Sequence, residues 1–153
     1  MIRIRKFRQR DAQELSALIC NTLRLINIRD YSEETIEKMC IHFSPEKLTK
    51  IAKDRVCFVA VNENRIIGTA SLKDNIILTV FVDAEIQGKG IGSKLINKVE
   101  NLALKNGYKK VKVPSSLTSV KFYEKLGYSQ VEQTDSDFGK NIIMEKCLKA
   151  EEI

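Results

Sequence analysis

The chain has 153 residues, 43% of them apolar, which is enough for one domain with a continuous core and too short for two. No apolar run approaches the roughly 18 residues of a bilayer-spanning helix, and no apolar segment follows the basic start, so we expect a cytoplasmic protein without a membrane anchor. The net charge of +6 is spread along the chain, with 26 basic and 20 acidic residues intermixed, which argues against nucleic acid as a partner.

The N-terminal third is predicted to be one strand followed by helices. Isoleucines alternate with arginines from Ile2 onward, a pattern typical of a strand. Residues 11–14, Asp-Ala-Gln-Glu, fit a capping box that opens a first helix. A second helix is expected from about Ser32 to Ile41, and Ser44-Pro45 favours the start of a third, short helix.

Three strands are predicted next, at about residues 56–61, 66–72 and 76–82. Each run is rich in β-branched and aromatic residues, and the turn-forming segments Asn-Glu-Asn and Lys-Asp-Asn separate them at hairpin lengths. An antiparallel meander fits this spacing best.

A long amphipathic helix is expected after the third of these strands. It ends at Asn106-Gly107 in a left-handed cap, and a short strand follows at residues 109–113. Its apolar stripe consists of Ile91, Leu95, Val99, Leu102 and Ala103.

The C-terminal part is predicted to contain one more helix and two strands. Residues 114–116, Pro-Ser-Ser, are expected to break the preceding strand and to cap this helix, and Gly127 stops it. Two strands at about residues 128–133 and 138–148 are joined by the polar residues 134–137.

The turn at residues 87–92, Gln-Gly-Lys-Gly-Ile-Gly, joins the third meander strand to the long helix. Its glycines Gly88, Gly90 and Gly92 leave the backbone bare, and the free N–H groups of the helix's first turn favour an anion such as phosphate. A Rossmann turn would need a third glycine where Ser93 stands, and a P-loop would need Gly-Lys-Ser/Thr after a four-residue spacer. A turn of purely structural purpose is the alternative.

The remaining pattern, Gln87-x-x-Gly90-x-Gly92, resembles the signature of the GNAT superfamily of acetyl-CoA-dependent N-acyltransferases. A second segment, from Ser116 to Tyr128, resembles that family's motif Asn-x-x-Ala-x-x-Phe/Leu-Tyr-x-x-x-Gly-Phe/Tyr, with serine at 116 and at 119 in place of the usual asparagine and alanine. The order of elements is similar to that of the GNAT fold along nearly the whole chain.

The resemblance implies an α/β fold in which helices flank a central mixed, mostly antiparallel sheet of about seven strands. Residues 1–149 would form a single N-acetyltransferase domain, followed by a tail at residues 150–153. The expected cofactor is acetyl-CoA, and no metal is expected, because the chain has one histidine and no closely spaced cysteine pair. Its four cysteines are expected to be core thiols.

The resemblance also implies roles for individual residues. The Val80 amide would contact the carbonyl oxygen that becomes negative during acetyl transfer, and Tyr123 would donate a proton to the departing sulfur. Contacts to the cofactor are expected from Val80, Phe81, Val82, Gln87, Gly88, Lys89, Gly90, Ile91, Gly92, Ser93, Ser116 and Ser119.

The general base is the gap in this assignment. Many GNAT enzymes carry a glutamate about four residues before the oxyanion amide, and Ile76 stands there in this chain. A water chain, a weakly basic acceptor amine, or another side chain could compensate. Side chains near the expected acceptor site that could contribute are Glu33, Glu37, His42 and Asp74.

The predicted function is acetyl transfer from acetyl-CoA to a primary amine of a small molecule or peptide by direct attack. One alternative is a non-catalytic acyl-CoA-binding module, which would retain the turn without the chemistry. Another is a nucleotide or nucleic-acid binder that uses the same anion site. The N-terminal helices and the loop between the last two strands would shape the acceptor pocket, and an exposed C-terminal edge strand leaves pairing into a homodimer open.

Overall fold

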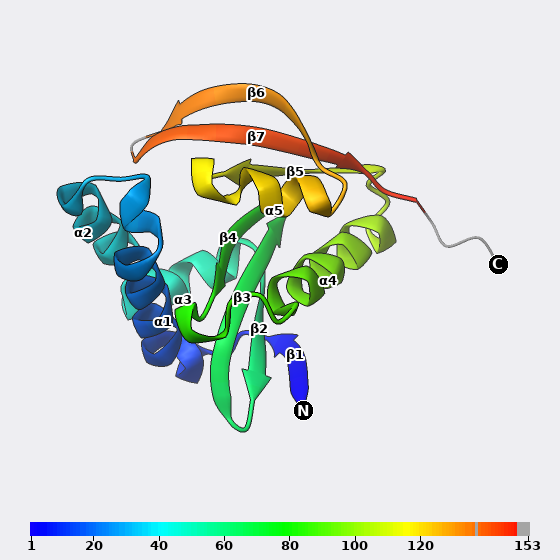
Figure 1. The fold of residues 1–153 in the computed structure, drawn as a ribbon. Coiled ribbons are helices and arrows are strands. Elements are labelled where there is room, and N and C mark those ends of the chain that lie inside the picture. Colours follow the sequence, from blue (N-terminus) through cyan, green and yellow to red (C-terminus); the bar gives the residue numbers. More distant parts are fainter. Residues whose placement is uncertain (137, 150–153) are drawn as a thin grey trace.

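A seven-stranded mixed sheet organises the fold (Figure 1). The computed structural model describes residues 1–136 and 138–149, so Asp137 and the expected tail at residues 150–153 lie outside the described part. The strands run in the order β1-β2-β3-β4-β5-β7-β6, and each neighbouring pair is antiparallel except β4 and β5. The predicted fold class, an α/β protein with a mixed, mostly antiparallel sheet, is confirmed.

The elements follow the predicted order. The strands are β1 (Ile2–Lys6), β2 (Val56–Asn62), β3 (Arg65–Lys73), β4 (Ile76–Val82), β5 (Lys110–Ser115), β6 (Ser129–Ser136) and β7 (Gly139–Cys147). The helices are α1 (Ala12–Leu25), α2 (Glu33–His42), α3 (Pro45–Asp54), α4 (Ile91–Lys105) and α5 (Val120–Lys125). Short 3-10 turns are η1 (Gln9–Asp11), η2 (Asn27–Arg29), η3 (Ala84–Ile86) and η4 (Leu117–Ser119).

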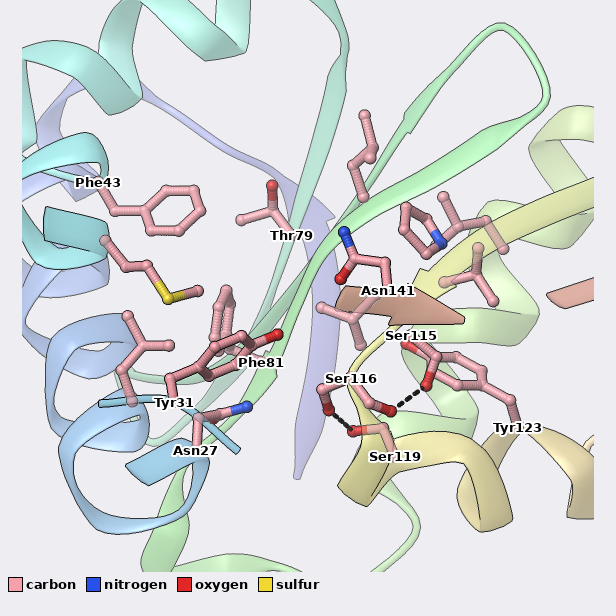
Figure 2. A pocket seen from close by; sticks show the side chains of 17 residues that line it. Asn27, Tyr31, Phe43, Thr79, Phe81, Ser115, Ser116, Ser119, Tyr123 and Asn141 are labelled. Carbon is pink, nitrogen blue, oxygen red and sulfur yellow. Dashed lines mark hydrogen bonds between the residues drawn. The ribbon is translucent and has the colours of Figure 1, made fainter. Parts of the chain in front are cut away.

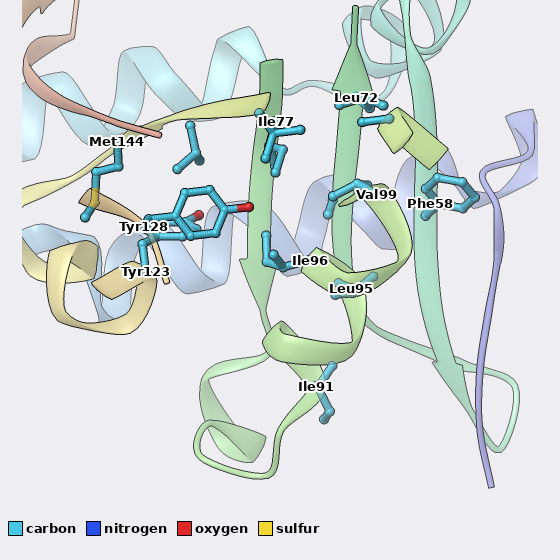
Figure 3. Packing of buried hydrophobic residues seen from close by; sticks show 14 of the residues in the cluster. Phe58, Leu72, Ile77, Ile91, Leu95, Ile96, Val99, Tyr123, Tyr128 and Met144 are labelled. Atoms are coloured by element: carbon cyan, nitrogen blue, oxygen red, sulfur yellow. The ribbon is translucent and has the colours of Figure 1, made fainter. Parts of the chain in front are cut away.

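Helices cover both faces of the sheet because successive strand residues point to opposite sides. In β2, Phe58 and Ala60 belong to the apolar cluster beneath α4 and α5, whereas Val59 and Val61 belong to the cluster beneath α1 and α2. Figure 3 shows the expected stripe of α4, including Leu95 and Val99, lying over the central strands. This packing holds the start of α4 against the end of β4.

The predicted capping box at the start of α1 is wrong. The Asp11 carboxylate instead accepts hydrogen bonds from Arg5 at 2.7 and 3.0 Å and from the Arg8 N–H at 2.7 Å, which ties η1 to β1. Glu14 reaches across to β3, where it accepts from the Ile66 N–H at 2.6 Å. Both carboxylates therefore satisfy partners outside their own helix.

Pro114 does not break β5, which continues to Ser115. The Lys112 N–H donates to the Asn75 carbonyl at 3.0 Å, at the start of β4. Because every second N–H of a strand points the same way, the nitrogen of Pro114 also faces β4. The two strands have separated there, so the missing proline N–H removes no bond. The prediction that Ser116 caps the following helix is also wrong, because its side chain accepts no hydrogen bond from a backbone N–H of η4.

The cysteines are free thiols of varied exposure. Cys40 is buried and Cys20 and Cys57 are partly buried, but Cys147 at the end of β7 is exposed, so the core assignment is wrong for that residue. Among residues 1–136 and 138–149, no group of three or more His, Cys, Asp or Glu side chains could hold a metal ion, and no helix is long and apolar enough to cross a membrane.

Candidate active site

The parallel strands β4 and β5 are joined at one end and separate toward the other. Ile76 pairs with Lys112, and the Asn75 side-chain amide donates to the Lys110 carbonyl at 3.2 Å. No further β4–β5 pair forms in the described part of the chain. The resulting opening exposes the edge of β4 from its middle to its end.

A β-bulge re-aims the backbone of β4 at this opening. Thr69 pairs with Phe81 and Ser71 with Leu78, so Thr79 and Val80 together oppose one residue of β3. Thr79 has a φ of 53°, which is uncommon for a β-branched residue and is a local strain typical of functional sites.

The amides of Val80 and Val82 point into the opening. The Asp83 N–H donates back to β3, to the Ile67 carbonyl at 2.9 Å, and alternation along the strand turns the N–H groups of residues 80 and 82 away from β3. The Val82 carbonyl confirms this direction, since it accepts from Gln87 Nε2 at 2.7 Å and lies 3.4 Å from Thr22 Oγ1. The N–H of Val80, the predicted oxyanion contact, thus faces the opening.

The glycine turn leads directly from this strand end to the start of α4. Asp83 anchors it by accepting from the Glu85 N–H at 2.9 Å and from Arg65 at 2.6 Å. Gly88 and Gly90 have φ values of 82° and 79°, the left-handed conformation that favours glycine. No side chain of the described residues caps the N-terminus of α4, so its first-turn N–H groups are open to an anion.

Glycine is required at position 92 for a different reason from the one that the sequence indicated. A Cβ at this position would lie 2.9 Å from the Phe122 ring, so glycine here lets α5 pack against the first turn of α4. The two GNAT-like segments are therefore in direct contact. The Gln87 side chain likewise has a structural partner, since its Nε2 donates to the Val82 carbonyl.

A cavity of about 460 Å³ runs along the opening from the glycine turn to Tyr123. Ten of the twelve predicted cofactor contacts line it; Lys89 is exposed and lines neither this cavity nor the next one described, and Ser116 lines only the latter. The apolar side chains of Ile26, Ile86 and Phe122 complete the wall. One end of this cavity lies at the N-terminus of α4, which favours an anion, and the rest is lined mainly by apolar side chains.

A second cavity, of about 160 Å³, is also lined by Val80. Figure 2 shows its labelled side chains. Asn27 and Tyr31 enter it from the connection between α1 and α2, Thr79 and Phe81 come from β4, and Asn141 comes from β7. The two cavities share Asn27, Val80, Phe81, Ser119 and Tyr123. They therefore meet at the amide and the phenol predicted to act in catalysis.

Tyr123 is 4% exposed, and both cavities reach it. Its hydroxyl has no hydrogen-bond partner among the described residues, whereas the neighbouring Tyr128 hydroxyl donates to Glu100 at 2.6 Å. Burial raises the pKa of Tyr123, so the phenol stays protonated at neutral pH. A protonated, unpaired phenol at this junction can donate a hydrogen bond to a ligand.

Ser116 and Ser119 stand on the opposite wall from the α1–α2 connection. Ser116 Oγ donates to Ser119 Oγ at 3.0 Å. Next to them, the Thr118 N–H and hydroxyl donate to Asp30 at 3.2 and 2.7 Å, a bond across the cavities between residues 88 positions apart. This contact joins η4 to the loop before α2 and narrows the opening.

None of the four side chains considered as bases lines either cavity. Glu37 is paired with Arg24 at 3.0 and 3.1 Å on the surface, and Asp74 lies in the β3–β4 turn. His42 contacts the rings of Phe43 and Phe138 instead. Burial together with nearby Lys47 and Arg55 lowers the pKa of His42.

The sequence did not indicate the polar residues of the smaller cavity. Asn27 and Tyr31 come from the α1–α2 connection, Thr79 from β4 and Asn141 from β7, and no sequence pattern links these three segments. Thr79 in particular sits in a run of β-branched residues that predicts an ordinary strand. Only the three-dimensional arrangement brings the four together.

Solved structures with the same fold include several acetyltransferases. An N-acetyltransferase from Rhodopseudomonas palustris is 24% identical, with a TM-score of 0.88 over 95% of each chain. The PaiA N-acetyltransferase of Thermoplasma acidophilum, solved in complex with coenzyme A, is 26% identical, with a TM-score of 0.83 over 97% of this chain and 99% of the other. An aminoglycoside 6'-N-acetyltransferase complexed with coenzyme A is 18% identical, with a TM-score of 0.70 over 99% of each.

No curated protein matches the chain at a significant level. A family model does: the acetyltransferase (GNAT) domain matches residues 27–146, more than three quarters of the chain. That range includes β4, the glycine turn, α4 and α5, and thus both segments that carried the resemblance. With this match and the sheet opening in place, the chain belongs to the GNAT family of acetyltransferases, and the predicted enzyme class, an acyltransferase, is confirmed.

Proposed function

We propose that this protein transfers an acetyl group from acetyl-CoA to a primary amine by direct attack. The observation that carries the proposal is the junction of two cavities at Val80 and Tyr123, a larger one that reaches the uncapped N-terminus of α4 and a smaller one on the side of Thr79. A donor thioester in the first and an amine in the second would meet at that junction.

The larger cavity suits coenzyme A. The first-turn amides of α4 and the backbone of Gly88 and Gly90 would hold the pyrophosphate, because a helix N-terminus with free N–H groups attracts phosphate. The pantetheine arm would lie along Val80–Val82, where the outward N–H groups of Val80 and Val82 and the Val80 C=O could pair with its amides as a further strand would. Coenzyme A in complexes of two structural relatives supports this placement.

Two groups at the junction would stabilise the reaction. As the amine attacks, negative charge develops on the thioester oxygen, and the Val80 N–H is a preorganised donor for it. The nitrogen forms a bond to the carbonyl carbon, the C–S bond breaks, and the sulfur leaves with the electron pair. The Tyr123 hydroxyl would donate a hydrogen bond to that sulfur, and the proton lost by nitrogen ends on the thiol, so the products are an amide and coenzyme A.

Free-thiol release from acetyl-CoA, measured over a panel of alkyl, aryl and α-amines, tests this function. We expect release that depends on both protein and amine, with a product heavier than the amine by one acetyl group. Acetyl-CoA binding without turnover on every amine would instead favour the non-catalytic acyl-CoA-binding module. A protein that binds nucleic acid with steep salt dependence, and which coenzyme A does not displace, would contradict the cofactor assignment.

A further inference from the structure

The smaller cavity is electrically neutral along its described lining. Its walls are made of aliphatic, aromatic, hydroxyl and carboxamide side chains, and the two tyrosines are the ionisable ones among them. Burial and the charge of Asp30 raise the pKa of Tyr31, and burial raises that of Tyr123, so both are uncharged at pH 7. An ammonium group bound here would find no carboxylate partner among the described lining residues.

The charged groups just behind the lining do not favour a cation either. Arg55 donates through Nη1 to Thr79 Oγ1 at 3.4 Å, and its Nη2 lies 3.9 Å from the Asp54 carboxylate. Its side chain is 17% exposed, so a positive charge that Asp54 balances in part lies behind the Thr79 wall. Asp30, the anion near Tyr31, is already engaged by the N–H and hydroxyl of Thr118. A positively charged acceptor would lose water contacts here without a compensating ion pair.

Size and wall composition favour a single planar ring. A cavity of about 150 Å³ lined by apolar side chains is known to hold one benzene molecule, and this one measures about 160 Å³. Phe43 and Phe81 form one wall, with ring centroids 5.8 Å apart in an edge-to-face arrangement. Such a corner packs well against a third aromatic ring.

Three unpaired polar groups point into this space. The side-chain amides of Asn27 and Asn141 and the Tyr31 hydroxyl have no hydrogen-bond partner among the described residues, and Figure 2 shows them directed toward the middle of the cavity. Carboxamides both donate and accept, so they suit an uncharged polar substituent or a ring nitrogen better than a full charge. They would orient a ring without requiring it to be ionic.

From these observations we propose that the acceptor is a ring-borne amine that is uncharged at neutral pH, an aryl or heteroaryl amine. The inference rests on the proposed acetyl transfer and deepens it. Such an amine arrives with its lone pair free, whereas an alkylamine with a pKa of about 10.4 is unprotonated in roughly one molecule in 2,500 at pH 7. With Ile76 in place of a glutamate, no base is then needed to deprotonate the amine before it attacks; the proton that nitrogen loses after attack ends on the thiol.

Aniline and cyclohexylamine form a matched substrate pair, because both carry one amine on a six-membered ring and they differ in charge at pH 7. Thiol release from acetyl-CoA should show a kcat/KM for aniline at least tenfold above that for cyclohexylamine at pH 7. The ratio should fall by up to a hundredfold between pH 7 and pH 9, because the neutral fraction of the alkylamine rises about tenfold per pH unit.

Equal or higher kcat/KM for cyclohexylamine at pH 7 would overturn the proposal and leave acetyl transfer intact. Turnover of other amines with neither ring amine accepted would overturn it too. If no amine of any class supports thiol release, the proposed function itself fails, and this inference with it.

A designed charge gives a second, independent test. Asn141→Asp places a carboxylate in the cavity, which should attract an ammonium and accept its proton, so the aniline to cyclohexylamine ratio should fall at least tenfold at pH 7. Asn101→Asp makes the same chemical change on the exposed side of α4 and should leave the ratio unchanged. An unaltered ratio in a folded Asn141→Asp protein would count against the neutral-acceptor assignment.

Discussion

Tyr123 is the residue on which the proposed chemistry at the junction depends most. The ordinary pKa of a phenol, about 10, is higher than that of a thiol, about 8.5, and burial raises the pKa of Tyr123 further. Complete proton transfer from this phenol to the thiolate would therefore be uphill by more than about 2 kcal/mol. Hydrogen-bond donation to the developing sulfur charge is therefore the role that the site suits. It requires the neutral phenol, which is the form present at pH 7.

Replacing this hydroxyl should affect turnover more than binding. We expect Tyr123→Phe to lower kcat about 100-fold and to change the acetyl-CoA Kd less than threefold, in steady-state kinetics and calorimetry. Tyr128→Phe is the control: its hydroxyl bonds Glu100 away from both cavities, so the loss should appear in the free energy of unfolding and not in kcat. Wild-type turnover in Tyr123→Phe would remove the residue from the mechanism.

Asp11 supplies a pH-dependent contact between η1 and β1. Burial acts to raise its pKa, but the Arg5 guanidinium and the Arg8 N–H outweigh that effect and lower it. The stability that Asp11 contributes is therefore present above about pH 4, the ordinary carboxyl range, and is lost as the pH falls through the lowered value.

Urea unfolding of Asp11→Asn tests this sign. At pH 7 the free energy of unfolding of the variant should be lower by about 2 kcal/mol, because a nearly buried charge-assisted pair is broken. This difference from the wild-type protein should become smaller below pH 4. Asp54→Asn breaks the exposed pair with Lys73 and should cost less than about 1 kcal/mol. A gap that is constant from pH 7 to pH 3 contradicts the assignment.

At the scale of an element, both ends of α4 have a left-handed glycine with open space around it. Gly90 has φ 79° and Gly107 has φ 94°, and a Cβ would meet nothing within 4 Å at either. Gly90→Leu and Gly107→Leu should thus impose a similar backbone strain of about 1–2 kcal/mol. Only Gly90→Leu should abolish coenzyme A binding in calorimetry, since only that end carries the proposed pyrophosphate site; equal affinities for the two variants would refute it.

Elements with a clear periodicity could be predicted from the sequence, and contacts between distant segments could not. The stripe of α4 and the turn residues between β2, β3 and β4 determine those elements locally, so their positions were confirmed. Glu14 was assigned to a local cap because its true partner, the Ile66 N–H, is 52 positions away. The bulge at Thr79 was equally hidden, because β3 imposes it from across the sheet.

On the scale of the whole molecule, strands β4 and β5 are paired at Ile76 and Lys112 and separate beyond these residues. Residues 27–31 from one side and η4 from the other meet over the opening through Asp30 and Thr118. The two cavities therefore meet along shared lining residues, as the proposed transfer within a ternary complex would require. That proposal involves no acetylated side chain.

Initial rates of thiol release, measured with acetyl-CoA and an accepted amine varied together, test this central claim most directly. Direct attack predicts double-reciprocal lines that converge, acetylated amine as the product, and no acetyl group on the protein when acceptor is left out. Parallel lines, together with an acetylated protein formed from acetyl-CoA alone, would contradict transfer across the Val80 and Tyr123 junction.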